Sequence, residues 1–409
     1  MFMNRRLIAK MILLILIIYF SFPIFSFASE DMYVWSSDAL TSSVSANTTD
    51  NSTSLNLDCG GAVLIEQNTG KILYDHNMHE KLRPASVTKV MTILLIMEAL
   101  DNGRITLDTK IPCSQNATSM GGSQIWLDPR ETLTVNEMLK AICVVSANDC
   151  TVAMAEYLAG SEEAFVIQMN ARAKELGMND TTFKNCHGID EDGHLTSAYD
   201  ISLMSRELLV NHPSITNYTT IWMDSLRDGK SSLVNTNKLI RNYKGATGLK
   251  TGSTSVALYN LSASATRDGL SLIAVILKAP NTKVRFAEAT KLLDYGFNTY
   301  SYSEFGKKED VVKSLTVSKG TLKNVNAILE NSTGALVKKG EEKNLVQNVN
   351  LQDSVQAPVT RGQILGEVTY SLNGEVVGRS NIIAEKDVSQ VTLWSMTGYL
   401  FQTWYQLIR

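Results

Sequence analysis

Two apolar segments joined by an Asp-Gly turn constrain the fold of this chain more than any other local feature. Residues 257–266 and 270–277 are apolar or small, and Arg267-Asp268-Gly269 separates them. Asp-Gly between two such runs is a strong signal for a β-hairpin, whose strands are antiparallel. Residues 62–65 and 72–74 predict an earlier hairpin of the same kind. The chain is therefore expected to build an antiparallel sheet, which other elements have to cover.

Helical periodicity fills most of the chain around these strands. Apolar residues recur at three- and four-residue steps after Pro84, which predicts a helix with Ser86 near its start that ends at Asn102-Gly103. Further helical patterns include 136–145, 162–176 and 284–300. The order of strands and helices predicts an α+β domain, in which helices flank an antiparallel sheet and form a helical insert.

Beyond about residue 308 the sequence predicts a small all-β domain. Short β-rich segments recur there with turns between them, and Asn373-Gly374 separates 367–370 from 376–377. No catalytic set of residues stands out in this part of the chain.

The last segment, residues 389–409, has a different character. On a helical wheel most of its large apolar residues, including Trp394 and Trp404, fall on one half, and Arg409 is its only charged residue. The apolar stretch is too interrupted to span a bilayer, whereas its tryptophans suit a helix that lies in the membrane interface. A terminal helix packed on the β-rich domain is the alternative. We expect peripheral membrane attachment through this amphipathic helix.

The first residues predict export. Arg5, Arg6 and Lys10 precede an unbroken apolar run, and Ser26-Phe27-Ala28 offers small residues for cleavage after Ala28. An uncleaved anchor helix is the alternative. Residues 30–55 are rich in Ser, Thr, Asn and Asp and predict a flexible tether. The predicted division is a signal peptide (1–28), a tether (29–57), a main domain (58–303), a β-rich domain (308–386) and the terminal helix (389–409).

Composition and charge exclude several classes of function. Hydrophobic residues make up 44% of the chain and the formal net charge is −3, so we expect a globular core and no nucleic-acid partner. The five cysteines show no C-x-x-C spacing, and the five histidines show no H-E-x-x-H motif. The sequence therefore gives little support for a metal site, and we expect no cofactor.

Ser86-Val87-Thr88-Lys89 is the only S-x-x-K in the chain. On a helix this spacing places a hydroxyl and an amine one turn apart on the same face. A serine hydroxyl needs a base to become a nucleophile, and a lysine can be that base when burial lowers its pKa. An ordinary solvated helix turn is the alternative, and the motif alone does not decide between them.

Two further motifs have weaker signals when each is taken alone. Lys250-Thr251-Gly252 occurs once, at a predicted strand, where the ammonium and hydroxyl suit a substrate carboxylate and Gly252 lets a ligand backbone approach. Ser146-Ala147-Asn148 follows a predicted amphipathic helix, whereas the S-x-N matches at Ser45 and Ser371 lie in the tether and in the β-rich region. A charged turn and an ordinary polar helix end are the alternatives.

Taken together and in this order, the three motifs resemble those of penicillin-binding proteins and class A β-lactamases. Residues 83–92, 146–149 and 248–254 look like the corresponding segments of the low-molecular-weight serine D-alanyl-D-alanine carboxypeptidases, and the resemblance spans about residues 60 to 300. It implies a β-lactamase/transpeptidase-like sheet with flanking helices and a helical subdomain. Val87 and Ser253 depart from the commonest pattern, and Ser253 leaves the substrate preference open.

The resemblance also implies roles for the motif residues. Ser86 would attack the carbonyl between the last two D-alanines of a peptidoglycan stem peptide, and Lys89 would take its proton. Ser146, held with Asn148, would pass a proton to the leaving D-alanine. Lys250 and Thr251 would bind the terminal carboxylate, and the amides of Ser86 and Ser253 would form an oxyanion hole. β-Lactam antibiotics would acylate the same serine.

The motifs do not choose the acceptor of the acyl group, so a transpeptidase or an endopeptidase is an alternative to a carboxypeptidase. Two functions of other kinds share these motifs. A serine β-lactamase of class A needs a glutamate in an E-x-x-L-N pattern, which the chain lacks after Glu162 and Glu163. A non-enzymatic wall-binding scaffold on the same fold would be favoured by the loss of a motif residue, and none is lost. We expect an exported hydrolase at the outer face of the cytoplasmic membrane. Cys143 and Cys150 are expected to be small buried residues, and His187 and His194 to make structural hydrogen bonds.

Overall fold

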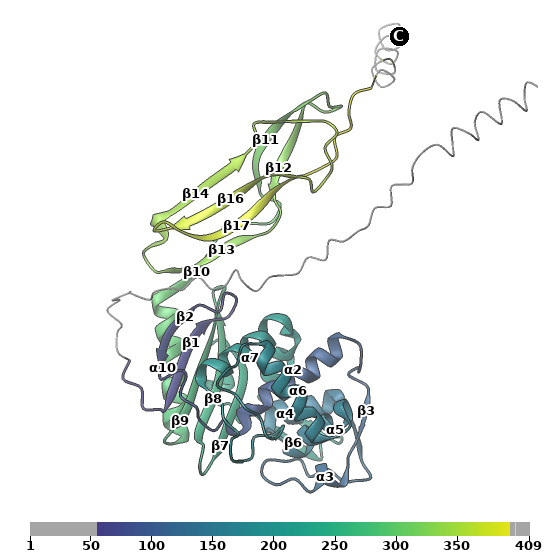
Figure 1. Ribbon diagram of the computed structural model, residues 1–409, viewed down its shortest axis with the longest axis vertical. Helices are drawn as coiled ribbons and strands as arrows, with labels where there is room; N and C mark the ends of the chain where they lie inside the picture. The colour runs from purple at the N-terminus through teal and green to yellow at the C-terminus, as the bar shows by residue number, and fades with distance from the viewer. Residues whose placement is uncertain (1–54, 393–396, 398–409) are drawn as a thin grey trace, which may run out of the picture. The chain divides into compact units, whose positions relative to one another are not determined.

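The computed structural model describes residues 55–392 and 397 (Figure 1). The predicted signal peptide, nearly all of the predicted tether and most of the predicted C-terminal helix lie outside these residues. No helix of the described part is both long enough and apolar enough to cross a membrane.

A five-stranded antiparallel sheet forms the centre of the first domain. Its strand order is β2-β1-β9-β8-β7. Both predicted hairpins are confirmed, since β1 pairs with β2 and β8 pairs with β9. Strand β1 also pairs with β9, so the first strands of the domain complete the sheet that its last strands build. The strands are β1 (Gly61–Glu66), β2 (Ile72–His76), β7 (Ala246–Thr254), β8 (Leu258–Arg267) and β9 (Leu270–Ala279).

Both faces of this sheet are buried, because alternate side chains of a strand point to opposite sides. In β1, Val63 and Ile65 belong to one apolar core, whereas Ala62 and Leu64 belong to the other. The helix α10 (Thr282–Thr299) supplies Leu292 and other residues to the second core. The helices α2 (Lys89–Asp101) and α7 (Ala198–Asn211) pack in the first core, on the opposite face of the sheet (Figure 1).

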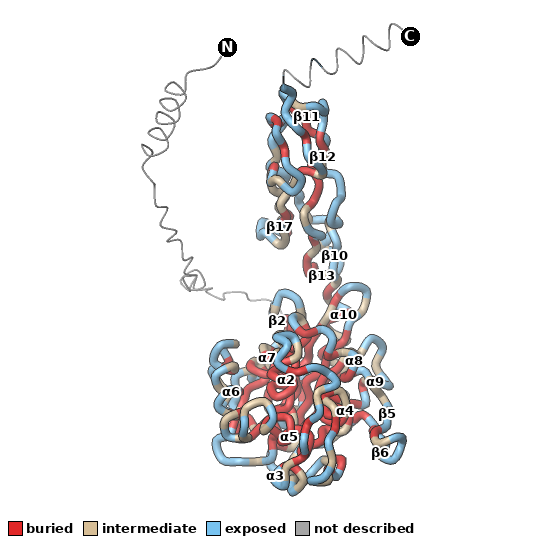
Figure 2. Tube along the Cα trace, turned by 90° about the vertical axis from the view of Figure 1, so that its right-hand side faces the viewer, coloured by how far each residue is buried: buried red, intermediate tan, exposed pale blue. Residues whose placement is uncertain are grey.

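The helical insert is confirmed and packs around α2. Figure 2 shows buried residues concentrated where α2, α4, α5 and α7 meet. The helix α4 begins with a capping box between Thr134 and Glu137, which matches the S/T-x-x-E pattern. The remaining helices are α3 (Gln115–Thr118), α4 (Val135–Val145), α5 (Asn148–Ala159), α6 (Glu162–Glu175), α8 (Thr216–Thr219) and α9 (Leu239–Asn242), with 3₁₀ turns η2 (Ala85–Thr88) and η3 (Pro213–Ile215). Two short strand pairs join β3 (Lys110–Pro112) to β4 (Thr132–Thr134) and β5 (Met223–Leu226) to β6 (Ser231–Val234).

The structure differs from the sequence prediction at the start of α2. Ser86 lies in the 3₁₀ turn η2, and the α-helix itself begins at Lys89. Ala85, directly before Ser86, has a φ of 48°, a left-handed conformation that a helical pattern does not reveal.

The second domain is all β, as predicted. It contains a six-stranded sheet with the order β14-β16-β17-β12-β11-β15 and a separate pair of β10 with β13. Asn373 and Gly374 both have positive φ, at 51° and 89°, which is the conformation that joins β16 to β17 in a tight hairpin. The strands are β10 (Tyr300–Gly306), β11 (Val311–Ser318), β12 (Asn324–Leu329), β13 (Thr333–Lys338), β14 (Leu345–Leu351), β15 (Ser354–Gln356), β16 (Ile364–Leu372) and β17 (Glu375–Ala384), with a 3₁₀ turn η4 (Glu342–Asn344).

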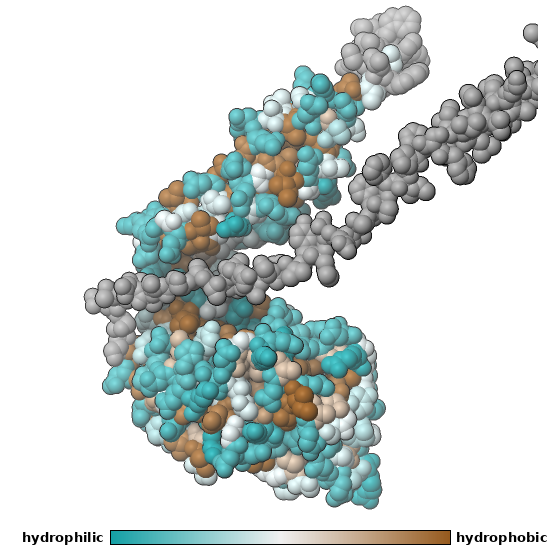
Figure 3. All heavy atoms as spheres, in the orientation of Figure 1, coloured by the Kyte–Doolittle hydropathy of each residue, from teal (hydrophilic) through white to brown (hydrophobic). Residues whose placement is uncertain are grey.

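Hydrophilic residues predominate on the face of the first domain seen in Figure 3, with apolar residues scattered among them. This distribution is that of an ordinary water-exposed surface.

Candidate active site

The first two motifs meet at one amine. The Nζ atom of Lys89 lies 3.0 Å from the Oγ atom of Ser86 and 2.6 Å from the Oδ1 atom of Asn148. Ser86 comes from η2, Lys89 from the first position of α2, and Asn148 from the first position of α5. Residues that are 59 positions apart in sequence are thus held together by the packing of α5 against α2.

Burial and neighbouring charge both favour the neutral form of Lys89. Its side chain is fully buried, and a charged ammonium is costly in such a place. Burial and, secondly, the positive charge of Lys250 hold the pKa of Lys89 well below its usual value.

The contacts of Lys89 match the hydrogen-bonding capacity of a neutral amine. Its Nζ atom donates to Asn148 Oδ1 and, at 2.7 Å, to the carbonyl oxygen of His187. Both partners are oxygens that can only accept, and a neutral amine has two N–H groups. In the neutral amine these two bonds leave the nitrogen lone pair for the Ser86 hydroxyl, which is the arrangement that a general base requires, whereas a charged ammonium would donate to all three oxygens.

Ser146 occupies a strained position at the end of α4. It has a φ of 65° and is 4% exposed. Its hydroxyl oxygen is buried and forms no hydrogen bond with another described residue. A strained residue with a buried and unsatisfied polar atom is unusual in a stable fold and is typical of functional sites.

The third motif lies in the middle of β7, the edge strand of the sheet. Lys250 is 1% exposed, and its Nζ atom donates to the carbonyl oxygen of Thr251 at 2.9 Å. The pKa of Lys250 is lowered to about 7, mainly by burial and to a smaller extent by the positive charge of Arg285. The hydroxyl of Thr251 lies 2.7 Å from that of Thr236. Ser253, two residues beyond Thr251, is exposed.

Gly252 is needed by the protein's own backbone. A Cβ atom at this position would lie 2.8 Å from the carbonyl oxygen of Pro84 and 2.9 Å from the amide nitrogen of Ser86. The space that this glycine leaves is therefore occupied by η2, whereas the sequence suggested close approach of a ligand backbone. The contact brings the K-T-G strand against the turn that carries Ser86.

Several residues that support the site had no clear signal in the sequence. The carboxylate of Asp149, which is fully buried, accepts from the amides of Ile125 and Leu127, both at 3.1 Å. These bonds fix the loop whose Gly121 carbonyl accepts from the Asn148 side chain at 2.7 Å. Asp149 could be suspected only because it follows the S-x-N motif. Thr236 lies in no motif.

The cysteines and histidines near the motifs have structural roles. Cys143 and Cys150 are buried, as expected, and both are unpaired; burial raises the pKa of both thiols. His194 Nε2 lies 2.8 Å from the Thr88 hydroxyl, and its Nδ1 accepts from the Lys184 amide. Burial lowers the pKa of His187 to about 3 and that of His194 to about 4, so both rings are neutral at physiological pH.

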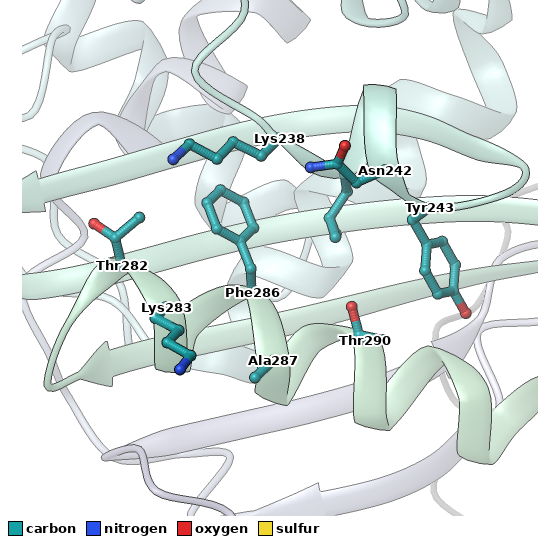
Figure 4. A pocket seen from close by; sticks show the side chains of 9 residues that line it. Lys238, Asn242, Tyr243, Thr282, Lys283, Phe286, Ala287 and Thr290 are labelled. Carbon is teal, nitrogen blue, oxygen red and sulfur yellow. The ribbon is translucent and has the colours of Figure 1, made fainter.

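A cavity of about 540 Å³ lies between α9 and α10 and includes none of the motif residues. Figure 4 shows Lys238, Tyr243 and Phe286 around it. No group of three or more His, Cys, Asp or Glu side chains within residues 55–392 is arranged to hold a metal ion.

Comparison with known proteins agrees with this geometry. The family model for D-alanyl-D-alanine carboxypeptidase matches residues 46–281, and that for the C-terminal domain of penicillin-binding protein 5 matches residues 300–390. The D-alanyl-D-alanine carboxypeptidase DacF of Bacillus subtilis is 46% identical over 333 residues, which cover 80% of this chain and 85% of that protein.

Solved structures show the same fold. Penicillin-binding protein 5 from Haemophilus influenzae is 28% identical, with a TM-score of 0.66 over 82% of this chain and 98% of that chain. Penicillin-binding protein D2 from Listeria monocytogenes, solved with bound ampicillin, is 31% identical, with a TM-score of 0.55 over 59% of this chain and 99% of that chain. The protein therefore belongs to the D-alanyl-D-alanine carboxypeptidase family and is a serine-type carboxypeptidase with the transpeptidase-like fold and C-terminal β domain of penicillin-binding protein 5.

Proposed function

We propose that the protein removes the C-terminal D-alanine from peptidoglycan stem pentapeptides through an acyl-enzyme on Ser86. The observation that carries this proposal is the placement of Lys89. In its neutral form Lys89 donates its two N–H groups to Asn148 and His187 and can accept from the hydroxyl of Ser86, which lies 3.0 Å away. A serine hydroxyl in contact with a buried neutral lysine is an activated nucleophile.

In the first step, Ser86 Oγ attacks the carbonyl carbon of the penultimate D-alanine and transfers its proton to Lys89 Nζ. The resulting oxyanion accepts from the backbone amides of Ser86 and Ser253, where each such donor stabilises the transition state by roughly 3 kcal/mol. The C–N bond to the last residue then breaks, and the leaving amine takes up a proton. An ester remains on Ser86.

Ser146 is the proposed carrier of that proton. Its hydroxyl has no competing hydrogen bond among the described residues, so it is free to accept a proton from Lys89 and donate one to the leaving amine. Asn148 holds Lys89 in place. We propose that its side chain also contacts the bound peptide. Water then attacks the ester with Lys89 again as the base, which releases the shortened peptide and restores Ser86.

The terminal carboxylate of the substrate is the proposed ligand of Lys250 and Thr251. Because Lys250 is almost fully buried, we propose that it attracts the carboxylate through its positive charge without a direct contact. The direct hydrogen bond to the carboxylate comes from the Thr251 hydroxyl, which lies 2.7 Å from the Thr236 hydroxyl and is oriented by it. Gly252 keeps this strand against η2, and Ser253 contributes its amide.

β-Lactams are proposed to acylate Ser86 in the same way, and the ampicillin-bound relative agrees with this. A β-lactamase would have to hydrolyse that ester rapidly, and no glutamate in an E-x-x-L-N pattern is available for it. A non-enzymatic scaffold on this fold would not need the paired arrangement of Ser86 and Lys89.

The nucleophile is tested by intact-mass measurement after treatment with penicillin, followed by peptide mapping. We expect one adduct, on the peptide that carries Ser86, and we expect that Ser86→Ala abolishes both the adduct and D-alanine release. Ser146→Ala is the informative companion, because it should slow acylation without moving the adduct. Labelling that persists in the Ser86→Ala variant contradicts the assignment.

As a member of its family the protein is extracytoplasmic. We propose that residues 1–28 direct its export, that 29–57 form a tether, and that 58–303 and 308–386 are separate domains. We further propose that 389–409 attach it to the outer face of the cytoplasmic membrane by a helix lying in the interface.

A further inference from the structure

The turn that carries Ser86 is held in a conformation that it would not adopt alone. Ala85 has a φ of 48°, in the left-handed region that is strained for most non-glycine residues. Such a residue persists only where its surroundings fix it. The reach of Ser86 toward Lys89 therefore depends on what holds this turn.

Close packing confines the turn on two sides. A Cβ atom on Gly188 would lie 2.0 Å from the carbonyl oxygen of Ala85, and one on Gly252 would lie 2.9 Å from the amide of Ser86. These glycines allow two backbone segments to press against the turn. Neither contact fixes the backbone that enters it, because van der Waals contact has no preferred direction.

The backbone that enters the turn is held by the bridge between Leu82 and Thr196 and, one residue later, by a side chain of the sheet. The Nδ2 atom of Asn260, in β8, donates to the carbonyl oxygen of Arg83 at 2.8 Å. Its Oδ1 atom accepts from the amide of Lys278, in β9, at 2.7 Å. Asn260 is fully buried, so both bonds are shielded from water, and they fix the direction in which the amide points.

A β-bulge makes this arrangement possible. Tyr259 pairs with Ala279 and Leu261 pairs with Ile276, so one residue of β8 lies opposite two residues of β9. Lys278, within the bulge, has a φ of 58°. A bulge leaves one residue out of the ladder and redirects neighbouring groups. Here the Lys278 amide is taken up by Asn260, which leaves the Asn260 NH₂ group aimed at Arg83.

The backbone of Asn260 is tied to the K-T-G strand as well. Gly252 and Asn260 are partners across β7 and β8, and the Nη1 atom of Arg285 lies 3.3 Å from the carbonyl oxygen of each. Arg285 is 6% exposed and comes from α10, on the far side of the sheet. Asn260 therefore links the strand that carries Lys250 to the segment that leads into Ser86.

We propose that Asn260 is a positioning residue for acylation, which fixes Arg83 and thereby keeps the strained Ala85-Ser86 turn in its reactive geometry. This inference rests on the proposed role of Ser86. It assigns Asn260 no contact with the substrate, so the residue acts on the rate of bond formation and not on substrate affinity.

Two substitutions separate the two bonds of Asn260. Asn260→Leu removes both, and Asn260→Asp keeps the acceptor for Lys278 while removing the donor to Arg83 at neutral pH. We expect both variants to lose about 10- to 100-fold in the first-order rate constant of acylation by penicillin, since a displacement near 1 Å has an effect of this size. The dissociation constant of the preceding complex should stay within about twofold of wild type.

A pH series gives a readout that simple loss of stability does not. A buried carboxyl has a raised pKa, and when protonated it can again donate to a carbonyl oxygen. The acylation rate of Asn260→Asp, divided by that of wild type at the same pH, should therefore rise as the pH is lowered. A ratio that stays constant with pH contradicts the need for a donor to Arg83.

Asn170→Leu is the matched control. The Asn170 side chain likewise donates to a carbonyl and accepts from an amide, both of Phe183 and both at 2.9 Å, and neither bond touches η2 or β7. Each variant is measured at a temperature where circular dichroism shows it fully folded. The proposal is overturned if folded Asn260→Leu acylates at the wild-type rate, or if Asn170→Leu loses acylation to the same extent. Peptide mapping of the Asn260 variants keeps the tests separate, because an adduct away from Ser86 would contradict the proposed nucleophile instead.

Discussion

The two buried lysines of the site are needed in opposite protonation states. Lys89 acts as a base only when it is neutral, and Lys250 attracts a carboxylate only when it is charged. Burial lowers the pKa of both lysines. The positive charge of Lys250 also lowers the pKa of Lys89, and the positive charge of Arg285 also lowers the pKa of Lys250. Mutual repulsion makes it easiest for the site to carry one charge, and the proposed division of roles puts that charge on Lys250.

The pH dependence of catalysis should show both lysines. Because the pKa of Lys89 is depressed, its neutral form is present above that pKa, and acylation should fall as the pH falls through it. Lys250, with a pKa of about 7, is charged below that pH, so affinity for a free carboxylate should fall as the pH rises above about 7. The measurement is kcat/KM for a peptide ending in D-Ala-D-Ala and for its C-terminal amide, on both sides of pH 7. An alkaline decline of equal size for both peptides contradicts the role of Lys250.

Removal of the Lys250 ammonium should affect substrates according to their charge. Lys250→Ala should lower kcat/KM for free-acid peptides by about 10- to 100-fold more than for C-terminally amidated peptides, since the field of this buried positive charge favours a carboxylate and has much less effect on a neutral amide. Steady-state kinetics on the paired peptides measures the difference. Lys238→Ala is a suitable control, because Lys238 lies at the separate cavity between α9 and α10. Equal losses on both peptides would indicate a general folding or proton-transfer role.

The identity of the central residues could be predicted from the sequence, but their supports could not. The spacing of Ser86 and Lys89 predicts that their side chains meet, and the contact is found at 3.0 Å. The His187 carbonyl, which takes one N–H of Lys89, is a backbone group and has no signature in the sequence. The role of Asn260 could not be predicted for another reason. It lies in a strand of mostly apolar or small residues, and its contact becomes known only when that strand is placed next to Arg83.

At the level of elements, the periodicity of the sequence predicted most strands and helices because their burial is regular. Residues 272–277 of strand β9 alternate between two apolar cores, so they form one continuous apolar run in the sequence. The helix α4 has one apolar face and a capping box. The exception is η2. Its 3₁₀ turn and the positive φ of Ala85 occur where Gly188 and Gly252, which come from distant parts of the chain, pack against the turn. Tertiary contacts of this kind leave no local pattern.

Contact between β7 and η2 should be sensitive to a single methyl group. Gly252→Ala would place a Cβ atom 2.8 Å from both the Pro84 carbonyl oxygen and the Val87 amide, so strand and turn must separate. We expect a loss of about 1–3 kcal/mol in the free energy of unfolding, typical of overpacking, and at least tenfold slower acylation. Chemical denaturation and penicillin acylation measure the two effects.

Gly378→Ala is the control for this substitution, since it is also a strand glycine, in β17, and its nearest neighbour would lie 3.8 Å from the new Cβ atom. It should leave acylation unchanged. If Gly252→Ala acylates as fast as wild type, the strand and the turn are not coupled in the way we describe.

At the scale of the whole molecule, the described residues include all the proposed catalytic groups, whereas most of the segment proposed for membrane attachment lies outside them. Within residues 55–392 there is no membrane-spanning helix. The segment proposed to attach the protein begins beside the β-rich domain, where the Ser389 carbonyl accepts from the Thr321 amide and the Val391 amide donates to the Lys319 carbonyl at 2.8 Å. Residues 389–391 therefore complete the edge of that domain, and a truncation that removes them would test folding and attachment together.

A truncation that begins at residue 393 separates the two effects. Removal of 393–409 should release the mature protein into the soluble fraction and leave D-alanine release from small peptides unchanged, because the catalytic domain keeps all its contacts. Arg409 is the only charge removed, so attachment should come mainly from burial of apolar residues such as Trp394 and Trp404, and washing with high salt should not detach the full-length protein. A double Trp394→Ser, Trp404→Ser variant should be released in the same way without any change in chain length. Sedimentation with membranes and circular dichroism of the released protein are the measurements, and a folded truncated protein that still sediments shows that the membrane contact lies elsewhere in the chain.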